Sequence, residues 1–178
     1  MLAEVYLGLG SNLGDRAGNI AAGVQTLRGF ARRVTVSAIY ESTPVGFGSQ
    51  PAFYNAVCCI WTPLDPFQLL ARLKRIESDM GRRRAFMNSP RTLDIDILMY
   101  GRVVLVSPGL IIPHPRMTER AFVLKPLAEL APGLFHPVLK QTVRSLLSRL
   151  KTPDRLIPHH RSGDATPGPV DWPRVLRA

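Results

Sequence analysis

The sequence is poor in cysteine and in long apolar runs, and both shortages exclude classes of protein. Its two cysteines, Cys58 and Cys59, are adjacent. Neighbouring side chains on a strand point to opposite faces, so we expect no bridge between them and no disulfide-stabilised scaffold. The chain has no run of about 18 apolar residues, which excludes a membrane-spanning helix of ordinary length. We therefore expect buried, reduced thiols and no membrane partner.

The start of the chain also lacks the pattern of a secretory signal. Glu4 stands where such a signal carries basic residues, and the chain becomes polar at Ser11 before an apolar stretch is complete. We expect the protein to be cytoplasmic.

Length and composition indicate one globular domain. The chain has 178 residues, of which 46% are hydrophobic and 20% are charged. A chain of this size can bury a core without metal or disulfide cross-links. The same composition excludes a largely disordered chain and a collagen-like or coiled-coil repeat.

Acidic residues are scarce relative to basic ones, and the imbalance is local. The chain carries 23 Lys and Arg against 13 Asp and Glu, a net charge of +10. Residues 72–91 contain seven basic and two acidic residues, so half of the excess lies within 20 positions. An evenly basic surface is typical of nucleic-acid binding, whereas a local cluster indicates one strongly anionic ligand.

The hydrophobic pattern predicts an α+β fold. Apolar or alternating runs predict strands over 5–9, 34–40, 56–61 and 93–100, with shorter extended segments at 103–106 and 111–115. Helical spacing predicts helices over 20–30, from Asp65 as N-cap to Gly81, and at 118–130 and 141–150. The order β-α-β-β-α-β is typical of an α/β sandwich in which helices pack on a mainly antiparallel sheet.

Two acidic residues interrupt the strand predicted over 93–100. Asp94 and Asp96 are two positions apart, so both carboxylates leave one face while Ile95 and Ile97 point to the other. Such a pair suits Mg²⁺, which takes one or two carboxylates, waters and substrate phosphate oxygens. Taken alone, an Asp-x-Asp pattern is more often a solvent-facing strand with ordinary surface acids.

Arginines precede the acidic pair. Arg82, Arg83, Arg84 and Arg91 lie on an irregular segment directly upstream. Guanidinium groups bind phosphate oxygens bidentately and keep their charge, so arginines beside a metal pair are typical of phosphoryl transfer. Each feature alone has an ordinary explanation as solvated surface, and together they favour a phosphate site.

Other catalytic patterns are missing. Three residues separate Gly10 from Gly14, where the dinucleotide fingerprint has two, and no Gly-Lys-Ser/Thr follows for a Walker loop. The sequence contains neither a G-x-S-x-G elbow nor a cysteine set for zinc. His114, between two prolines, is by itself a weak candidate for catalysis.

Five motifs together resemble the 6-hydroxymethyl-7,8-dihydropterin pyrophosphokinase family over about residues 3–150. They are Gly10-Ser11-Asn12-Leu13-Gly14-Asp15, Pro51 to Ala56, Arg82-x-Arg84, Pro90-Arg91-Thr92-Leu93-Asp94-Ile95-Asp96-Ile97-Leu98, and Pro113-His114-Pro115-Arg116-Met117. The resemblance implies a ferredoxin-like fold and transfer of the β,γ-pyrophosphoryl group of ATP to the pterin hydroxymethyl oxygen, with release of AMP. It assigns residues 1–150 to the pyrophosphokinase domain, and we expect the proline-rich segment 151–178 to be a poorly packed tail.

The resemblance also implies roles for individual residues. Asp94 and Asp96 would hold two Mg²⁺ ions, and Arg82 and Arg91 would neutralise the migrating phosphates. The ATP site would comprise Leu70, Lys74, Glu77, Arg84, Ile97, His114 and Arg120. The pterin site would comprise Ser42, Thr43, Pro44, Val45, Phe53, Asn55 and Phe122, with the flat ligand between the two aromatic rings and Asn55 reading its polar edge.

The chain departs from the family pattern at several of these positions. Lys74 replaces a frequent glutamine, Phe53 replaces a tyrosine, and Asn88-Ser89 stands where many members have Trp-Gly. Gly109 and Ile111 stand where an arginine and a threonine can assist ATP binding. We expect these differences to change affinity and loop closure more than reaction type.

Two alternatives to a monomeric, Mg²⁺-dependent enzyme remain at this point. A small sheet with helices and a +10 charge also describes RNA-recognition modules, although Asp94 and Asp96 would repel a phosphodiester backbone in the absence of metal. A homologue that binds ATP without turnover is the other alternative. We expect ATP and a pterin, and no nucleic acid, as partners.

Overall fold

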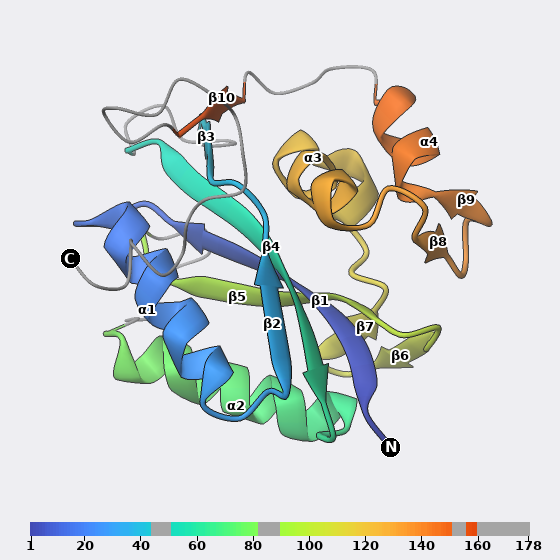
Figure 1. The fold of residues 1–178 in the computed structure, drawn as a ribbon, viewed down its shortest axis with the longest axis horizontal. Coiled ribbons are helices and arrows are strands. Elements are labelled where there is room, and N and C mark those ends of the chain that lie inside the picture. Colours follow the sequence, from blue (N-terminus) through green and yellow to red (C-terminus); the bar gives the residue numbers. More distant parts are fainter. Residues whose placement is uncertain (44–50, 82–89, 151–155, 160–178) are drawn as a thin grey trace.

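Antiparallel pairing between strands far apart in the chain builds the central sheet. The computed structural model describes residues 1–43, 51–81, 90–150 and 156–159. The strands lie in the order β10-β3-β4-β1-β5, and β2 also pairs with β4 (Figure 1). They are β1 (Ala3–Ser11), β2 (Arg33–Val36), β3 (Tyr40–Ser42), β4 (Phe53–Thr62), β5 (Asp94–Tyr100) and β10 (Ile157–Pro158).

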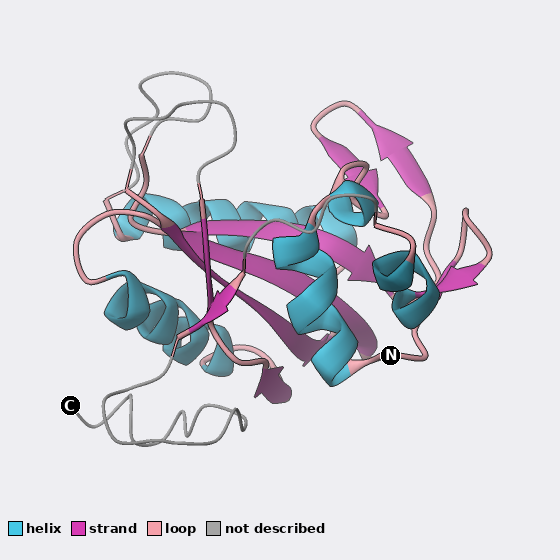
Figure 2. Ribbon diagram, turned by 90° about the horizontal axis from the view of Figure 1, so that it is seen from above, coloured by secondary structure: helices cyan, strands magenta, loops and turns pink. Residues whose placement is uncertain are grey.

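Two hairpins lie outside this sheet. One consists of β6 (Leu105–Ser107) and β7 (Leu110–Ile112), and the other of β8 (Phe135–His136) and β9 (Gln141–Thr142). The β6–β7 hairpin extends beyond the end of the large sheet, which is clearest in the view from above (Figure 2).

Helices cover both faces of the sheet (Figure 1). The described residues contain α1 (Arg16–Arg28), α2 (Pro66–Asp79), α3 (Ala121–Leu130), α4 (Val143–Ser148) and a 3₁₀ turn at Met117–Glu119. One apolar core lies between the sheet and α1 with α2, and a second lies between the sheet and α3 with α4. Within the described ranges, no helix has both the length and the apolar character needed to cross a membrane. The predicted α+β class is confirmed, and the order of the main elements differs from the predicted β-α-β-β-α-β by one additional strand between α1 and α2.

The helix starts follow their capping residues. Helix α1 begins at Arg16, four residues before the predicted start, because the Asp15 side chain accepts a hydrogen bond from the Gly18 N–H at 2.9 Å. Helix α2 begins after Asp65 as predicted, with a full capping box to Gln68. Gly81 follows it with a φ of 82°, a left-handed conformation that favours glycine.

The strand predicted over 34–40 is two strands. The Ser37 hydroxyl accepts the Val57 N–H at 3.0 Å and donates to the Ala38 carbonyl at 2.8 Å. This side chain takes the place of a backbone partner, so β2 and β3 pair with different parts of β4 on either side of the break. The alternating pattern did not reveal this, because a serine in a strand looks like any other polar position.

Alternation along β4 sends its side chains to two separate cores. Ala56 and Cys58 face α1 and α2, whereas Val57 and Cys59 face α3 and α4. Both thiols are free and buried, as predicted. Burial, with a smaller contribution from the Glu4 carboxylate, raises the pKa of Cys59 to about 11.

Part of the C-terminal segment belongs to the sheet. Of the residues predicted to form a poorly packed tail, the structure describes 156–159. Ile157 and Pro158 pair with Glu41 and Tyr40 of β3 and so form an edge strand.

His136 makes the stability of the fold sensitive to acid. Its imidazole is buried, and its Nδ1 accepts the Leu139 N–H at 3.1 Å. Burial holds its pKa below the usual 6.5, so acidification protonates the unfolded chain first and favours unfolding. Stability should therefore fall as the pH drops below about 6.5.

Thermal unfolding of the wild type and of His136→Asn between pH 7.5 and 5.5 tests this expectation. The asparagine can accept the same N–H but does not titrate, so the melting temperature of the variant should fall less. An equal fall in both proteins would show that other groups carry the acid sensitivity.

Candidate active site

Four strands bring a row of site residues together across one face of the sheet. Tyr40 pairs with Asn55, Asn55 with Gly10, and Gly10 with Asp94. Directly paired residues of antiparallel strands share a face. Ile95 and Ile97 lie in the core beneath α1 and α2, so Asp94 and Asp96 face the α3 side, as the two-residue spacing predicts.

Two glycines separate the carboxylates from the aromatic and amide side chains. Gly8 pairs with Asp96 and Val57, and Gly10 pairs with Asp94 and Asn55. A Cβ atom added at Gly10 would lie 3.7 Å from Asn55 Oδ1 and 3.9 Å from the Phe53 ring. At Gly8 an added Cβ would lie 3.4 Å from the Leu98 side chain, so it is at Gly10 that β1 offers bare backbone between Asp94 on β5 and Phe53 and Asn55 on β4.

Arg91 lies against the acidic pair. Its Nη1 is 2.6 Å from Asp94 Oδ2, and both side chains are mostly buried. Its guanidinium carbon also lies 5.8 Å from the centre of the Phe53 ring. Its Nε is buried without a partner among the described residues. Arg91 thus connects the carboxylate end of the site to the aromatic end.

Asn12 fixes the backbone that carries Arg91. Its side-chain oxygen accepts the Arg91 N–H at 2.8 Å, and its own N–H donates to the Arg91 carbonyl at 3.1 Å. Asn12 is buried. Sequence reasoning gave it no role, although it stands inside the Gly10 to Asp15 motif. Only the structure shows that this motif lies beside the start of β5.

The buried Glu77 carboxylate of α2 is hydrogen-bonded to the residue between the two aspartates and also pairs with the partly exposed Lys74. Both Glu77 oxygens lie 3.0 Å from Lys74 Nζ, and Oε1 also accepts the Ile95 N–H at 2.7 Å. Glu77 is 2% exposed, and burial raises its pKa while the Ile95 hydrogen bond and Lys74 oppose the shift. Because β5 is the last strand in the sheet order, no further strand pairs with its outer edge. The Glu77 carboxylate accepts the Ile95 N–H at this edge instead.

His114 and Arg120 lie within the electrostatic influence of the same carboxylates. The His114 N–H donates to the Leu98 carbonyl of β5 at 2.9 Å, and its Nδ1 accepts the Arg116 N–H at 3.1 Å. Burial lowers the pKa of His114, and the Asp96 carboxylate partly opposes this. Burial likewise lowers the pKa of Arg120, again opposed by Asp96 and Asp94. These groups therefore experience the electrostatic field of the acidic pair.

Polar and aromatic groups border the other side of the glycines. Asn55 donates to the Ser42 hydroxyl at 2.9 Å, and both residues are buried. Phe53 pairs with Ser42 across β3 and β4, while Thr43 follows them and is exposed. Phe122, on α3, packs at the edge of the second core with the Arg120 guanidinium 5.5 Å from its ring centre.

Other predicted site residues lie elsewhere. Leu70 and the Ile97 side chain pack in the core beneath α1 and α2, on the face opposite Asp94 and Asp96. Arg82, Arg84, Pro44 and Val45 lie outside the described residues. In the part of the chain that the structure covers, no group of three or more His, Cys, Asp or Glu side chains could hold a metal. A metal at this site would therefore draw on the two aspartates and on ligand oxygens.

Comparisons of the sequence with a family model and with curated proteins agree on one family. The model of the 7,8-dihydro-6-hydroxymethylpterin-pyrophosphokinase family matches residues 6–132. The 2-amino-4-hydroxy-6-hydroxymethyldihydropteridine pyrophosphokinase of Aquifex aeolicus is 39% identical over 143 residues, covering 80% of this chain and 89% of that protein. The folic acid synthesis protein fol1 of Pneumocystis carinii is 45% identical over 148 residues, covering 82% of this chain but only 20% of that longer protein.

A solved structure shares the fold. The wild-type Plasmodium falciparum HPPK-DHPS crystal structure with SDX-DHP superposes with a TM-score of 0.69 at 17% identity, covering 84% of this chain and 44% of that one. At that identity the match concerns the fold alone. The family-model match and the bacterial relative reach further: this chain belongs to the 7,8-dihydro-6-hydroxymethylpterin-pyrophosphokinase family.

Proposed function

We propose that this protein transfers the β,γ-pyrophosphoryl group of ATP to the hydroxymethyl oxygen of 6-hydroxymethyl-7,8-dihydropterin and releases AMP. The observation that supports this most is the row Asn55–Gly10–Asp94 across three paired strands. It places a bare stretch of sheet between a group that can recognise a heterocycle and a group that can bind a metal–phosphate complex. Both substrates of such a transfer must lie on one surface, with their reacting atoms close together.

The two aspartates fit Mg²⁺ bound together with ATP. They supply hard oxygen ligands from one face of β5 and leave the remaining positions to water and phosphate oxygens, which is the coordination that Mg²⁺ prefers. We assign two Mg²⁺ ions to this pair together with the nucleotide. When bound, the metal neutralises charge on the phosphates and helps to orient them.

Cationic residues complete the phosphate end. Arg91 is held by Asn12 at its backbone and by Asp94 at its guanidinium, so its charge is already placed beside the position of the acidic pair. Arg120 and His114, which lie within the electrostatic influence of both aspartates, donate to phosphate oxygens in our proposal. We assign Arg82 to the migrating phosphates and Arg84 to ATP from the family motif. Preplaced donors of this kind stabilise charge on phosphoryl oxygens with little reorganisation.

The nucleotide lies along α2 and β5 in this proposal. Lys74 is partly exposed beside the buried Glu77, so it presents a cation at this edge, where relatives often have glutamine. Glu77 acts here by holding Lys74 and the Ile95 N–H. Leu70 adds apolar surface, and Ile97 contributes through its main chain, because its side chain is in the core.

The pterin lies over Gly10, between the rings of Phe53 and Phe122. Asn55 and Ser42 already form one hydrogen bond, and the Asn55 carbonyl and the Ser42 hydroxyl proton remain to read the polar edge of the ligand. Thr43, Pro44 and Val45 continue from β3 and complete the pterin site by their resemblance to the family. We further propose that the protein works as a monomer.

A product assay tests the proposed function. The protein is incubated with ATP, Mg²⁺ and 6-hydroxymethyl-7,8-dihydropterin, and nucleotides are separated by chromatography. AMP should form in a pterin-dependent manner. Formation of ADP, or no turnover that depends on the pterin, would overturn the proposal, and the second result would favour a homologue that only binds ATP.

Replacing Asp94 or Asp96 by Asn should reduce turnover by about a hundredfold or more, because several kcal/mol of charge stabilisation by the metal are lost. The melting temperature should change little for Asp96→Asn, whereas Asp94→Asn also removes the ion pair with the mostly buried Arg91 and should lower it. Asp79→Asn is the matched control: Asp79 is 71% exposed on α2 and pairs only loosely with Arg75, at 3.9 Å. If Asp96→Asn keeps activity within tenfold of the control, the metal assignment is wrong.

Asn55→Ala should raise the KM for the pterin by about tenfold or more, because a buried polar edge of the ligand loses its partner. The KM for ATP should stay within twofold. Ser42→Ala removes only the neighbouring hydroxyl and should have a smaller effect of the same kind. Steady-state kinetics with each substrate varied separately measure both constants, and a change mainly in the KM for ATP would place Asn55 in the wrong half of the site.

A further inference from the structure

The C-terminal strand β10 (Ile157–Pro158), followed by His159, attaches to the part of the sheet that carries the proposed pterin residues. Ile157 pairs with Glu41 and Pro158 with Tyr40, and the His159 N–H donates to the Ile39 carbonyl at 2.9 Å. This strand lies outside residues 6–132, to which the family model corresponds. It covers the outer edge of β3, which otherwise ends the sheet on that side.

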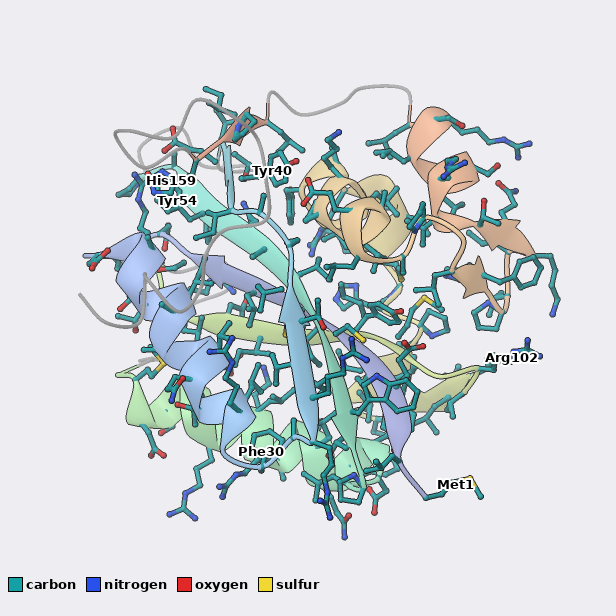
Figure 3. All side chains as sticks on the ribbon, in the orientation of Figure 1. Met1, Phe30, Tyr40, Tyr54, Arg102 and His159 are labelled. Atoms are coloured by element: carbon teal, nitrogen blue, oxygen red, sulfur yellow. The ribbon has the colours of Figure 1, made fainter. Side chains whose placement is uncertain are left out.

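The His159 side chain adds a second contact, on the face opposite the site. Its ring lies 4.5 Å from the Tyr54 ring at an angle of 40°, and Figure 3 shows the two side chains next to each other beside β10 and β3. The Arg16 guanidinium lies 3.8 Å from the centre of the same Tyr54 ring. Arg16 also donates to the Ala52 carbonyl at 2.7 Å and lies 3.3 Å from Glu41. We call Arg16, Glu41, Tyr54 and His159 the back-face cluster.

The back-face cluster lies directly behind the proposed pterin residues. Glu41 pairs with Tyr54, and the next pair, Ser42 with Phe53, points to the other face. Asn55 follows Tyr54 and also points to that other face. Because neighbouring residues share a rigid backbone, a contact that restrains Tyr54 also restrains the Cα positions of Phe53 and Asn55.

The cluster joins three parts of the chain at this point. Arg16 is the first residue of α1, Glu41 and Tyr54 come from the paired strands, and His159 directly follows the C-terminal strand. The Arg16–Glu41 ion pair is partly exposed and contributes little by itself. The tilted pair of rings and the cation over Tyr54 supply the directional contacts.

We infer that His159 is a positioning residue for the pterin site. Acting through Tyr54, it holds the β3–β4 end of the sheet so that Ser42, Phe53 and Asn55 keep the spacing that pterin binding requires. This inference rests on the proposed function. It gives the C-terminal segment a task in substrate recognition that its proline-rich composition does not suggest.

Steady-state kinetics of full-length point variants test this role. His159→Ala should raise the KM for the pterin by about threefold to tenfold, the range that one lost aromatic pair represents, with the KM for ATP and kcat within twofold of the wild type. His159→Phe keeps a ring and should restore the wild-type KM. Ile157→Ala is the matched control, since this neighbouring side chain is 48% exposed and should leave both constants unchanged.

A double-mutant cycle shows whether His159 acts through Tyr54. If it does, His159→Ala combined with Tyr54→Leu should raise the KM for the pterin no more than Tyr54→Leu alone. Amide hydrogen exchange at Glu41 and Ser42 should be faster in His159→Ala than in Ile157→Ala, which gives a readout independent of turnover.

The two possible failures are distinct. A wild-type protein without pterin-dependent AMP would overturn the proposed function. An active wild type together with a His159→Ala variant that has a lower melting temperature but an unchanged KM for the pterin would overturn the positioning role alone. Effects of His159→Ala and Tyr54→Leu that simply add would also contradict it.

Discussion

The register between β1 and its two neighbours is the constraint on which the site depends. Strand β1 pairs with β4 on one side and β5 on the other, so each residue of β1 faces one partner on each strand. With Gly10 opposite both Asn55 and Asp94, an amide and a carboxylate lie on one face with no side chain between them. A shift of one residue in either pairing would move one of these groups to the opposite face of the sheet. Strand register therefore determines which groups share the face of the site, and the individual side chains act within that arrangement.

Several ion pairs and hydrogen bonds balance the charges around β5. Arg91 forms an ion pair with Asp94. The Asp96 carboxylate acts electrostatically on Arg120 and His114. The buried Glu77 is paired with Lys74 and also accepts the Ile95 N–H. Arg91 and Lys74 each pair directly with a carboxylate, that of Asp94 and that of Glu77. Such an arrangement provides fixed donors for an anionic ligand. The local excess of basic residues in the sequence corresponds in part to this balance, because Lys74 and Arg91 both belong to it.

Much of the fold was predictable from residue patterns, because alternation and capping act locally. The order of the main elements apart from the additional strand, the face shared by Asp94 and Asp96, and the start of α2 at Asp65 follow from such patterns. The break at Ser37 and the earlier start of α1 depend on single side-chain hydrogen bonds that a pattern of apolar residues does not encode. The Lys74–Glu77–Ile95 link and the contact between Asn12 and Arg91 were not predictable, since they join segments whose proximity only the folded sheet determines. The pairing of Ile157 and Pro158 with β3 was missed for the same reason, and also because proline is uncommon in strands other than edge strands.

We propose above all that one face of the sheet binds metal-bound nucleotide at the two aspartates and the pterin over Gly10. The most direct test of this proposal is a crystal structure of the protein with Mn²⁺, a non-hydrolysable ATP analogue and 6-hydroxymethyl-7,8-dihydropterin, with metal positions taken from anomalous scattering. We expect anomalous density beside Asp94 and Asp96 and the pterin over Gly10, between Phe53 and Phe122. Metal density away from the two carboxylates, or a pterin bound on another face of the sheet, would contradict it.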